Sequence, residues 1–367
     1  MSDSNVSTEQ TPGRSSFEIG HMTFVEITED PRTGRLPSAH QRSRETIEQA
    51  RLADQVGLDL FAVGEHHRTD FVGSAPAMVL AAAAEATENI RLTSSVTVLS
   101  SEDPVRVWEQ FATLDQFSGG RAEIIAGRGS YTESFPLFGY DLADYADLFR
   151  EKLDLLLKIR SRNPLTWSGR FRPALDHADI GPRAVQDELP IWVGVGGTPA
   201  SAVSTGRLGL PMAMALLMGP ITSHEQTIEM YRAAAEQAGH DPAALRTSIN
   251  LHGYVGRTSQ GARDTMYPYF ARGMMDNNHQ RGQGFQLPRA AFDAQTSPNA
   301  GLVVGSAQEV IDKLLAYHEI YGLDRALIQI GFGGMPQKDV LESIEILGTE
   351  VAPVVRREVA ARKEKAA

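Results

Sequence analysis

Residues 41–67 read QRSRETIEQARLADQVGLDLFAVGEHH and contain the pattern from which the architecture of the chain can be inferred. Its first part has the 3.6-residue periodicity of a helix, which the glycine Gly57 is expected to end. A short apolar run follows, and directly after it come an acid and two imidazoles, Glu65, His66 and His67. A helix, a glycine and a strand with a polar end form the repeating unit of a parallel α/β protein.

The same unit recurs along the chain. Short apolar or β-branched runs alternate with helical stretches, and eight such runs can be counted, at residues 17–27, 58–64, 90–99, 122–126, 190–195, 211–217, 248–255 and 326–330. An open doubly wound sheet usually has about five to seven strands, so eight favour a closed (β/α)8 TIM barrel, which is an α/β fold. A chain of 367 residues fits one such domain, which we expect over residues 17–350.

Three segments fall outside this alternation. Residues 1–16 are predicted to be a disordered polar tail, and residues 351–367 a charged, alanine-rich C-terminal tail. Residues 273–305 are polar, glycine-rich and aperiodic, and this insertion late in the chain is too long for an ordinary connection. We expect it to act as a mobile lid over the barrel mouth, the alternative being a disordered insertion.

Composition excludes several classes of function. A formal net charge of −11 disfavours nucleic acid and anionic membranes, so a bound phosphate must be held by a local site. The absence of cysteine excludes disulfides, thiol catalysis and thiolate metal sites. No apolar export segment is present, and the longest apolar stretch, residues 75–84, is about half the length that crosses a bilayer. A cytoplasmic protein with no membrane or nucleic-acid partner is expected.

The polar end of the second strand is the first candidate for chemistry, because catalytic residues of such barrels follow the carboxyl ends of strands. Successive strand residues face opposite sides, so Glu65 and His67 share a side and His66 takes the other. One metal ion held by both histidines is therefore awkward, and no metal site is predicted. We expect Glu65 to orient an imidazole by hydrogen bonding.

Groups suited to an anion follow the fourth and fifth strands. An arginine, hydroxyl groups and flexible glycines lie there, and a helix begins near residue 199, whose first amides suit a phosphate. These candidates are Arg128, Ser130, Tyr131, Gly196, Gly197, Thr198 and Ser201. A rival lies at the glycine-rich residues 331–335 after the eighth strand, and the residues alone leave the two sites tied. Small hydroxyl residues in the third strand indicate that something flat packs there.

Several pieces of this sequence occur together in one known family. They are Glu65-His66-His67, residues 98–106, the run through residues 114–121, Arg128-Gly129 and residues 208–211. In this order and spacing they resemble the bacterial luciferase-like flavin-dependent monooxygenases, over most of residues 17–350. What the resemblance implies is a barrel that binds reduced FMN, with its phosphate at Arg128 and the fifth strand end, which breaks the tie with residues 331–335.

The resemblance also assigns roles. It implies a non-proline cis peptide bond at Ser95–Val96, where these two residues support the flavin ring, and a catalytic acid or base at His66 beside Glu65. Gly196 and Gly197 replace an acid and a serine of the luciferase subunit, so the phosphate contacts differ in detail. A homodimer is expected from the family.

The activity that the resemblance implies is two-component monooxygenation. Reduced FMN from a separate NAD(P)H:flavin reductase reacts with dioxygen, and a C4a-peroxyflavin transfers one oxygen atom to a small organic substrate. Light emission is not implied. Two alternatives stay open: a deazaflavin-dependent hydride-transfer oxidoreductase on the same fold, and a non-catalytic flavin-binding protein. A metal-dependent barrel hydrolase would need paired histidines on the first strand, where only His21 is present.

Overall fold

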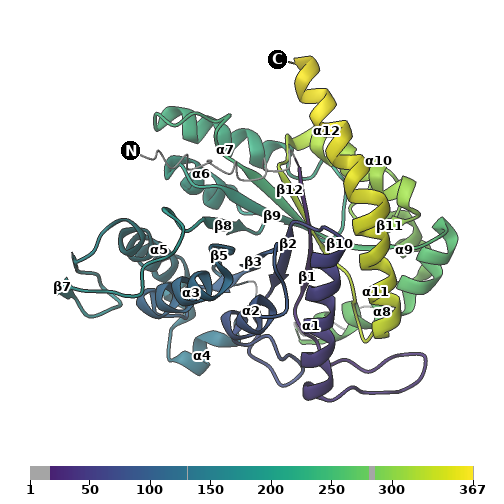
Figure 1. The fold of residues 1–367 in the computed structure, drawn as a ribbon, viewed down its shortest axis with the longest axis horizontal. Helices are drawn as coiled ribbons and strands as arrows, with labels where there is room; N and C mark the ends of the chain where they lie inside the picture. Colours follow the sequence, from purple (N-terminus) through teal and green to yellow (C-terminus); the bar gives the residue numbers. More distant parts are fainter. Residues whose placement is uncertain (1–16, 130, 281–285, 367) are drawn as a thin grey trace, which may run out of the picture.

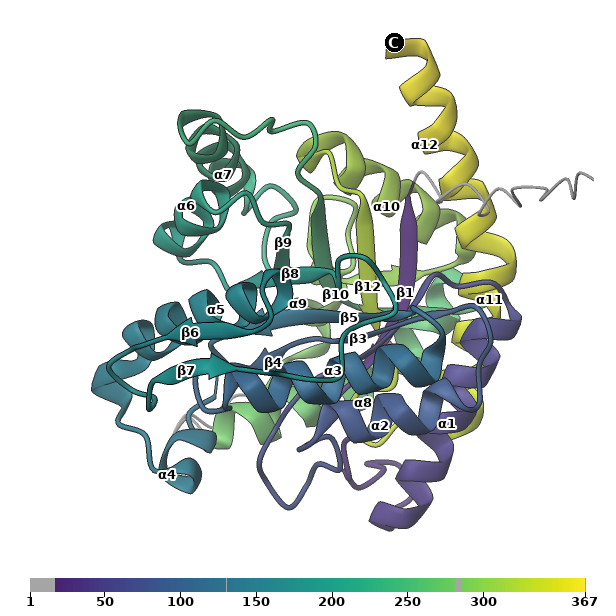
Figure 2. The ribbon, with the colours of Figure 1, turned by 60° about the vertical axis from the view of Figure 1, so that its left-hand side comes forward.

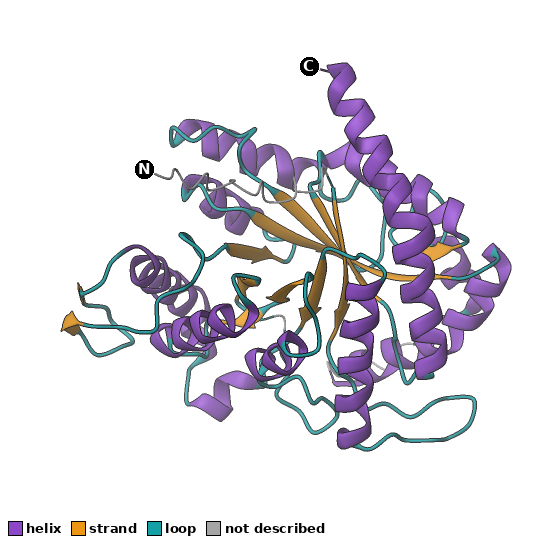
Figure 3. Cartoon of the chain, viewed as in Figure 1, coloured by secondary structure: helices purple, strands orange, loops and turns teal. Residues whose placement is uncertain are grey.

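The centre of the molecule is a closed barrel of parallel strands, surrounded by helices (Figures 1 and 3). The computed structural model describes residues 17–129, 131–280 and 286–366. Around the barrel the strands pair in the order β1, β2, β3, β5, β8, β9, β10 and β12, and β12 pairs with β1 to close it. The predicted (β/α)8 barrel is confirmed. The strands are β1 (Glu18–Thr23), β2 (Leu60–Val63), β3 (Arg91–Ser94), β4 (Thr97–Val98), β5 (Ala122–Gly127), β8 (Ile191–Val195), β9 (Met212–Leu216), β10 (Thr247–Val255) and β12 (Arg325–Gln329).

Helices connect successive strands and bury their apolar faces against the outside of the barrel (Figure 3). Several are delimited by the expected signals: Asp103 caps the start of α3, where its side chain accepts a hydrogen bond from the amide of Val105, and Gly119 ends the helix with φ 66°. The helices are α1 (Ala39–Gln55), α2 (Pro76–Ala84), α3 (Pro104–Ser118), α4 (Ser134–Phe138), α5 (Tyr145–Ser161), α6 (Pro199–Arg207), α7 (Glu225–Gln237), α8 (Ser259–Gln280), α9 (Arg289–Gln295), α10 (Ala307–Tyr321), α11 (Gln337–Ile346) and α12 (Ala352–Ala366).

A buried ion network closes the amino-terminal end of the barrel. The guanidinium of Arg325, at the start of β12, has no exposed surface and contacts Glu18 at 2.6 Å and Glu123 at 2.8 Å. Its carbon also lies 4.3 Å from the centre of the Trp192 ring. Since the strand ends that carry chemistry in this fold are at the opposite end, this network belongs to the stability of the barrel.

Elements that the strand count did not predict lie between β5 and β8. Beside α5, the helix expected in this connection, the chain forms the short helix η1 (Leu142–Asp144) and an antiparallel hairpin of β6 (Leu165–Trp167) and β7 (Leu175–Ala178). The hairpin lies outside the barrel, on the side of α5 (Figure 2). It leaves the barrel order unchanged.

Residues 273–305, predicted to be irregular, hold more regular structure than expected. They contain the end of α8, all of α9 and β11 (Val303–Gly305), which pairs with β10. Residues 281–285 lie outside the described residues. The role of this segment as a lid stays a prediction.

The charged C-terminal segment is a helix, not a tail. After the π-helical turn η2 (Leu347–Val351), α12 runs to Ala366, and its end projects from the body of the molecule (Figures 1 and 2). Val355 and Val359, four residues apart, have no exposed surface, so one face of α12 is packed although the helix carries many charged residues. Among the helices described, none has both the length and the apolar character that crossing a membrane requires.

Candidate active site

A cavity of about 810 Å³ opens at the carboxyl ends of the barrel strands. Residues from the ends of β2, β3, β5, β8, β10 and β12 line it together, although they are far apart in the sequence. Most of the residues predicted from sequence meet here, and those that line the cavity are Glu65, His66, Ser95, Val96, Arg128, Tyr131, Gly196 and Thr198. Ser130 lies outside the described residues.

His66 is held on one side by a carboxylate and on the others by aromatic rings. Its Nδ1 lies 2.8 Å from Oε1 of Glu133, a residue of the loop after β5. Burial, the largest single effect, opposes the ionisation of Glu133. The hydrogen bond with His66, a backbone hydrogen bond and the attraction of His66 and Arg68 together outweigh it and keep the pKa of this carboxyl below its usual value. The ring centres of Phe71 and Tyr131 lie 4.6 and 4.5 Å from the centre of the imidazole ring. Because Nδ1 is engaged, Nε2 is the nitrogen available for proton transfer.

Glu65 orients the neighbouring imidazole, as predicted. Its Oε1 lies 2.7 Å from Nε2 of His67, and its Oε2 accepts a hydrogen bond of 2.9 Å from the amide of Val98. The hydrogen bond with Glu65 raises the pKa of His67. Glu65 therefore fixes His67 and the end of β4, and His66 has a separate partner.

The third barrel strand is interrupted where a flat group was expected to pack. The Ser95–Val96 peptide bond is cis and separates β3 from β4. The side chain of Val96 occupies the space that a Cβ at Gly127 or Gly194 would need, with contacts of 2.6 and 2.8 Å, so only glycine fits at these positions of β5 and β8. The result is a shallow floor of backbone and small side chains at the base of the cavity.

The fourth and fifth strand ends meet at a positively charged corner. The Nη2 of Arg128 donates a hydrogen bond of 2.8 Å to the hydroxyl of Ser201, in the first turn of α6. Thr198 is the N-cap of α6, and its side chain makes no capping hydrogen bond. A Cβ at Gly196 or Gly197 would meet nothing within 4 Å, so the approach to the helix is open. Residue 199 is a proline without an amide hydrogen, and the amide of Ser201 donates to the carbonyl of Thr198 at 2.9 Å. The groups that this corner offers to an anion are therefore chiefly the guanidinium of Arg128, the hydroxyl of Ser201 and the positive end of the α6 dipole.

Two buried polar atoms point to a polar group of a ligand inside the barrel. The Oδ1 of Asn250 and the Nδ1 of His252 have no hydrogen-bond partner, and both residues line the cavity. The Nδ2 of Asn250 donates to the hydroxyl of Ser95 at 2.7 Å. Burial lowers the pKa of His252 to about 4, so its imidazole is neutral. Unpaired buried polar atoms are costly, and the hydrogen-bonding edge of a flavin ring on the Ser95–Val96 floor would pair them.

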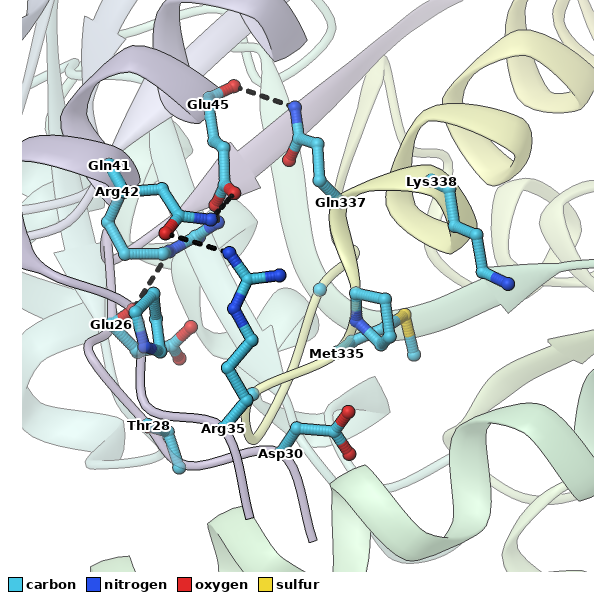
Figure 4. Close-up of a pocket in the computed structure, with 14 residues that line it drawn as sticks. Glu26, Thr28, Asp30, Arg35, Gln41, Arg42, Glu45, Met335, Gln337 and Lys338 are labelled. Carbon is cyan, nitrogen blue, oxygen red and sulfur yellow. Dashed lines mark hydrogen bonds and ion pairs between the residues drawn. The ribbon is translucent and has the colours of Figure 1, made fainter. Parts of the chain in front are cut away.

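The rival site after the eighth strand is a separate, smaller cavity. Gly331, Gly334 and Met335 line a space of about 300 Å³ together with residues of the loop after β1 and of α1 (Figure 4). The side chains of Arg35 and Gln41 are hydrogen-bonded at 3.1 Å across it. This cavity is polar, and the residues of the cis peptide bond, Ser95 and Val96, do not line it.

Sequence reasoning missed three residues that complete the main cavity. Glu133 lies in the loop after β5 that already held three candidates, so the strand-end rule could have included it. Asn250 and His252 are two residues apart on β10, which places both on the same side of the strand. That alternation of polar residues in an otherwise apolar strand was the available signal.

Comparison with known proteins agrees with this geometry. Residues 17–324 match the family model described as luciferase-like monooxygenase. The oxygenase component of the flavin-dependent trigonelline monooxygenase of Acinetobacter baylyi is 25% identical over 325 residues, which cover 84% of this chain and 89% of that protein.

Solved structures share the fold along nearly the whole chain. The oxygenating constituent of 3,6-diketocamphane monooxygenase of Pseudomonas putida, in complex with FMN, superposes with a TM-score of 0.75 at 23% identity, covering 92% of this chain and 98% of that one. An F420-dependent secondary alcohol dehydrogenase superposes with a TM-score of 0.72 at 20% identity, covering 93% and 99%. The fold therefore serves flavin and deazaflavin enzymes alike.

The barrel, its carboxyl-end cavity and these relatives define the class of the protein: it is an enzyme, a flavin-dependent oxidoreductase. More narrowly, the chain belongs to the luciferase-like monooxygenase family.

Proposed function

We propose that this protein is an FMN-dependent monooxygenase that takes reduced flavin from a separate NAD(P)H-dependent reductase. When bound, the reduced flavin would supply the electrons that activate dioxygen at its C4a position. The residues of the chain bind it, orient it and manage protons. The observation that carries the proposal is the pairing of Arg128 with Ser201 at the uncapped start of α6, which suits a terminal phosphate group.

The other cavity residues have roles that follow from their contacts. The Ser95–Val96 floor supports the flavin ring, and Asn250 and His252 offer hydrogen bonds to its polar edge. His66, fixed by Glu133, exchanges a proton through Nε2 with the reacting groups above the ring. Phe71 and Tyr131 pack against His66 and keep water from that part of the cavity.

Charge also bears on the choice between FMN and a deazaflavin. Arg128 is the only arginine or lysine among the described residues that line the cavity. The phosphate of coenzyme F420 continues into an acidic tail, which further cations would help to hold, whereas the phosphate of FMN is terminal. The cavity thus favours FMN. The same lack of cations favours uncharged or weakly charged organic substrates over sulfonates.

A stopped-flow experiment tests the proposal. Protein mixed anaerobically with reduced FMN is exposed to dioxygen, and absorbance is followed in the near ultraviolet and at the visible band of oxidised flavin. We expect a delay between oxygen addition and the return of oxidised flavin. Immediate oxidation at the rate of free flavin would support a flavin-binding protein without activity. Tight binding of reduced F420 with no binding of FMN would replace monooxygenation by hydride transfer.

We further propose that the protein is a homodimer that works in the cytoplasm. Large apolar side chains are exposed on the neighbouring helices α2 and α3: Met78 is 71% exposed and Phe117 is 69% exposed. Analytical ultracentrifugation should give a dimer, and charged residues at both positions (Met78→Glu with Phe117→Glu) should give monomers. A monomeric wild-type protein at micromolar concentration would contradict the dimer.

A further inference from the structure

One carboxyl group is shared by the two cavities. Glu26, in the loop after β1, lines the main cavity and also the polar cavity of about 300 Å³ between that loop, α1 and the loop after β12. Figure 4 shows it on the wall of the polar cavity, below Arg42. No other residue in the described part of the chain lines both cavities. Glu26 is thus the group through which the interior of the barrel meets the polar cavity.

The backbone before Glu26 is held in an unusual conformation. Val25 has φ 57° and no exposed surface, and a β-branched residue rarely adopts this left-handed region. The hydroxyl of Thr23 accepts a hydrogen bond from the amide of Val25 at 3.0 Å, and the carbonyl of Val25 accepts one from the amide of Val72 at 3.0 Å. Glu26 itself pairs with Phe71 in an antiparallel bridge. Such a conformation persists where the surroundings impose it, often at functional sites.

The carboxyl group of Glu26 has a polar partner but no direct ion pair among the described residues. The Nε2 of Gln329 donates to its Oε1 at 3.0 Å, and Nε of Arg42 donates at 3.0 Å to the backbone oxygen of Glu26. The guanidinium of Arg42 is paired instead with Glu45 at 2.8 Å. Burial raises the pKa of Glu26 to about 7. The attraction of Arg42 opposes this shift, and the repulsion of Asp70 adds to it.

Other charged and titratable groups also line the two cavities. Those of the main cavity are Glu65, His66, His67, Arg128, Tyr131, Glu133, Tyr145 and His252, and those of the polar cavity are Asp30, Arg35, Arg42, Glu45 and Lys338. Those around the polar cavity are spread over three elements. A group of intermediate acidity that lines two cavities can take a proton from one and give it to the other.

We propose that Glu26 is a proton-relay residue, which passes protons between solvent in the polar cavity and the reaction cavity. The inference rests on the proposed function. Anionic reduced flavin, dioxygen, a substrate and one proton yield oxidised flavin, the substrate with one added oxygen atom, and water. One proton must therefore reach the reaction cavity in each turnover. The carboxyl group of Glu26 releases its proton inward and takes a new one from solvent on the other side.

Infrared difference spectroscopy of the cofactor-free protein tests the relay without any activity. We expect a protonated-carboxyl band that is lost with a midpoint near pH 7, as the pKa of about 7 requires. The band should be absent in Glu26→Gln and retained in Asp30→Asn, a carboxylate that lines only the polar cavity. A band unchanged in Glu26→Gln would overturn the assignment, as would a midpoint below about pH 5, where an ordinary carboxyl group titrates.

Flavin reoxidation gives a second test. With FMN affinity checked by fluorescence, Glu26→Gln should slow the return of oxidised flavin at neutral pH at least tenfold and flatten its pH profile. Glu26→Asp, which keeps a carboxyl group, should recover part of the rate, and Asp30→Asn should match the wild type. Equal rates and profiles in Glu26→Gln and wild type would refute the relay. Failure of the wild type to bind FMN would refute the proposed function, while the infrared titration would still report on Glu26.

Discussion

We expect cofactor binding to depend most on Arg128. Its removal (Arg128→Ala) should weaken FMN binding about tenfold to a hundredfold, because a charge-assisted hydrogen bond contributes about 1.5–3 kcal/mol. Riboflavin lacks the phosphate and should bind the variant and the wild type alike. Quenching of flavin fluorescence measures both affinities. Arg150→Ala, which changes an arginine with 74% of its side chain exposed, is the matched control. An equal loss of riboflavin binding would mean that Arg128 supports the cavity and not the phosphate.

Glu123 gives a prediction about pH. Burial alone would raise the pKa of this carboxyl, but Arg325 and Arg91 lower it to about 2, from an ordinary value of 4.5. Since the folded pKa is the lower one, the carboxylate stabilises the fold fully above about pH 4.5, and this contribution is lost as pH falls toward 2. Glu123→Gln should therefore lower the free energy of unfolding by about 3–5 kcal/mol at neutral pH.

Urea denaturation followed by tryptophan fluorescence measures this loss. The difference between wild type and Glu123→Gln should shrink as the pH is lowered from about 5 to 3. Glu188→Gln removes a carboxylate that pairs with Arg160 but is 69% exposed, and should change stability by less than about 1 kcal/mol. A difference that does not depend on pH would show that packing, and not charge, causes the loss.

The residues that sequence could identify are those whose partners are close by or whose position follows a general rule. Glu65 and His67 are two residues apart, and their pairing was predictable. The partner of His66 is 67 residues away in the sequence, and no local pattern specifies it. Glu26 was missed because its role depends on a backbone turn at Val25 that the sequence does not signal.

Helix α6 allows the phosphate site to be tested through its cap. Thr198→Asp would add a carboxylate at the start of the helix, where its charge interacts favourably with the helix dipole and opposes a phosphate. We expect an FMN affinity at least tenfold weaker, with a melting temperature equal to or above that of the wild type. Thr198→Ala, which adds no charge, is the control. Unchanged FMN binding in Thr198→Asp would exclude the start of α6 from the phosphate site.

Strands were easier to predict from sequence than the elements packed outside them. All eight barrel strands lie within the predicted apolar runs or within one residue of them, because each is buried on both faces. The β6–β7 hairpin was missed since its strands are short, and β7 is largely exposed. Helix α12 was missed because its many charges mask a narrow apolar face.

We expect the stability of the whole molecule to depend on α12. Besides burying Val355 and Val359, α12 places Arg356 at 2.7 Å from Asp59, the residue before β2. A chain ending at residue 351 should lose at least about 3 kcal/mol of stability, from the burial of the two valines alone. Thermal unfolding followed by circular dichroism measures the effect. A chain ending at residue 362, which removes mainly exposed residues, should melt close to the wild type. If the chain ending at residue 351 melted at the same temperature as the wild type, α12 would be dispensable for stability.

The ion network around Arg325 lies at one end of the barrel and the reaction cavity at the other. Variation can therefore accumulate in the loops of the cavity without weakening the network that keeps the barrel closed. For an engineer this separation means that a library randomised around the mouth should yield mostly folded proteins, from which new oxygenation specificities can be selected. For evolution it means that substrate range can drift while the scaffold is inherited nearly intact.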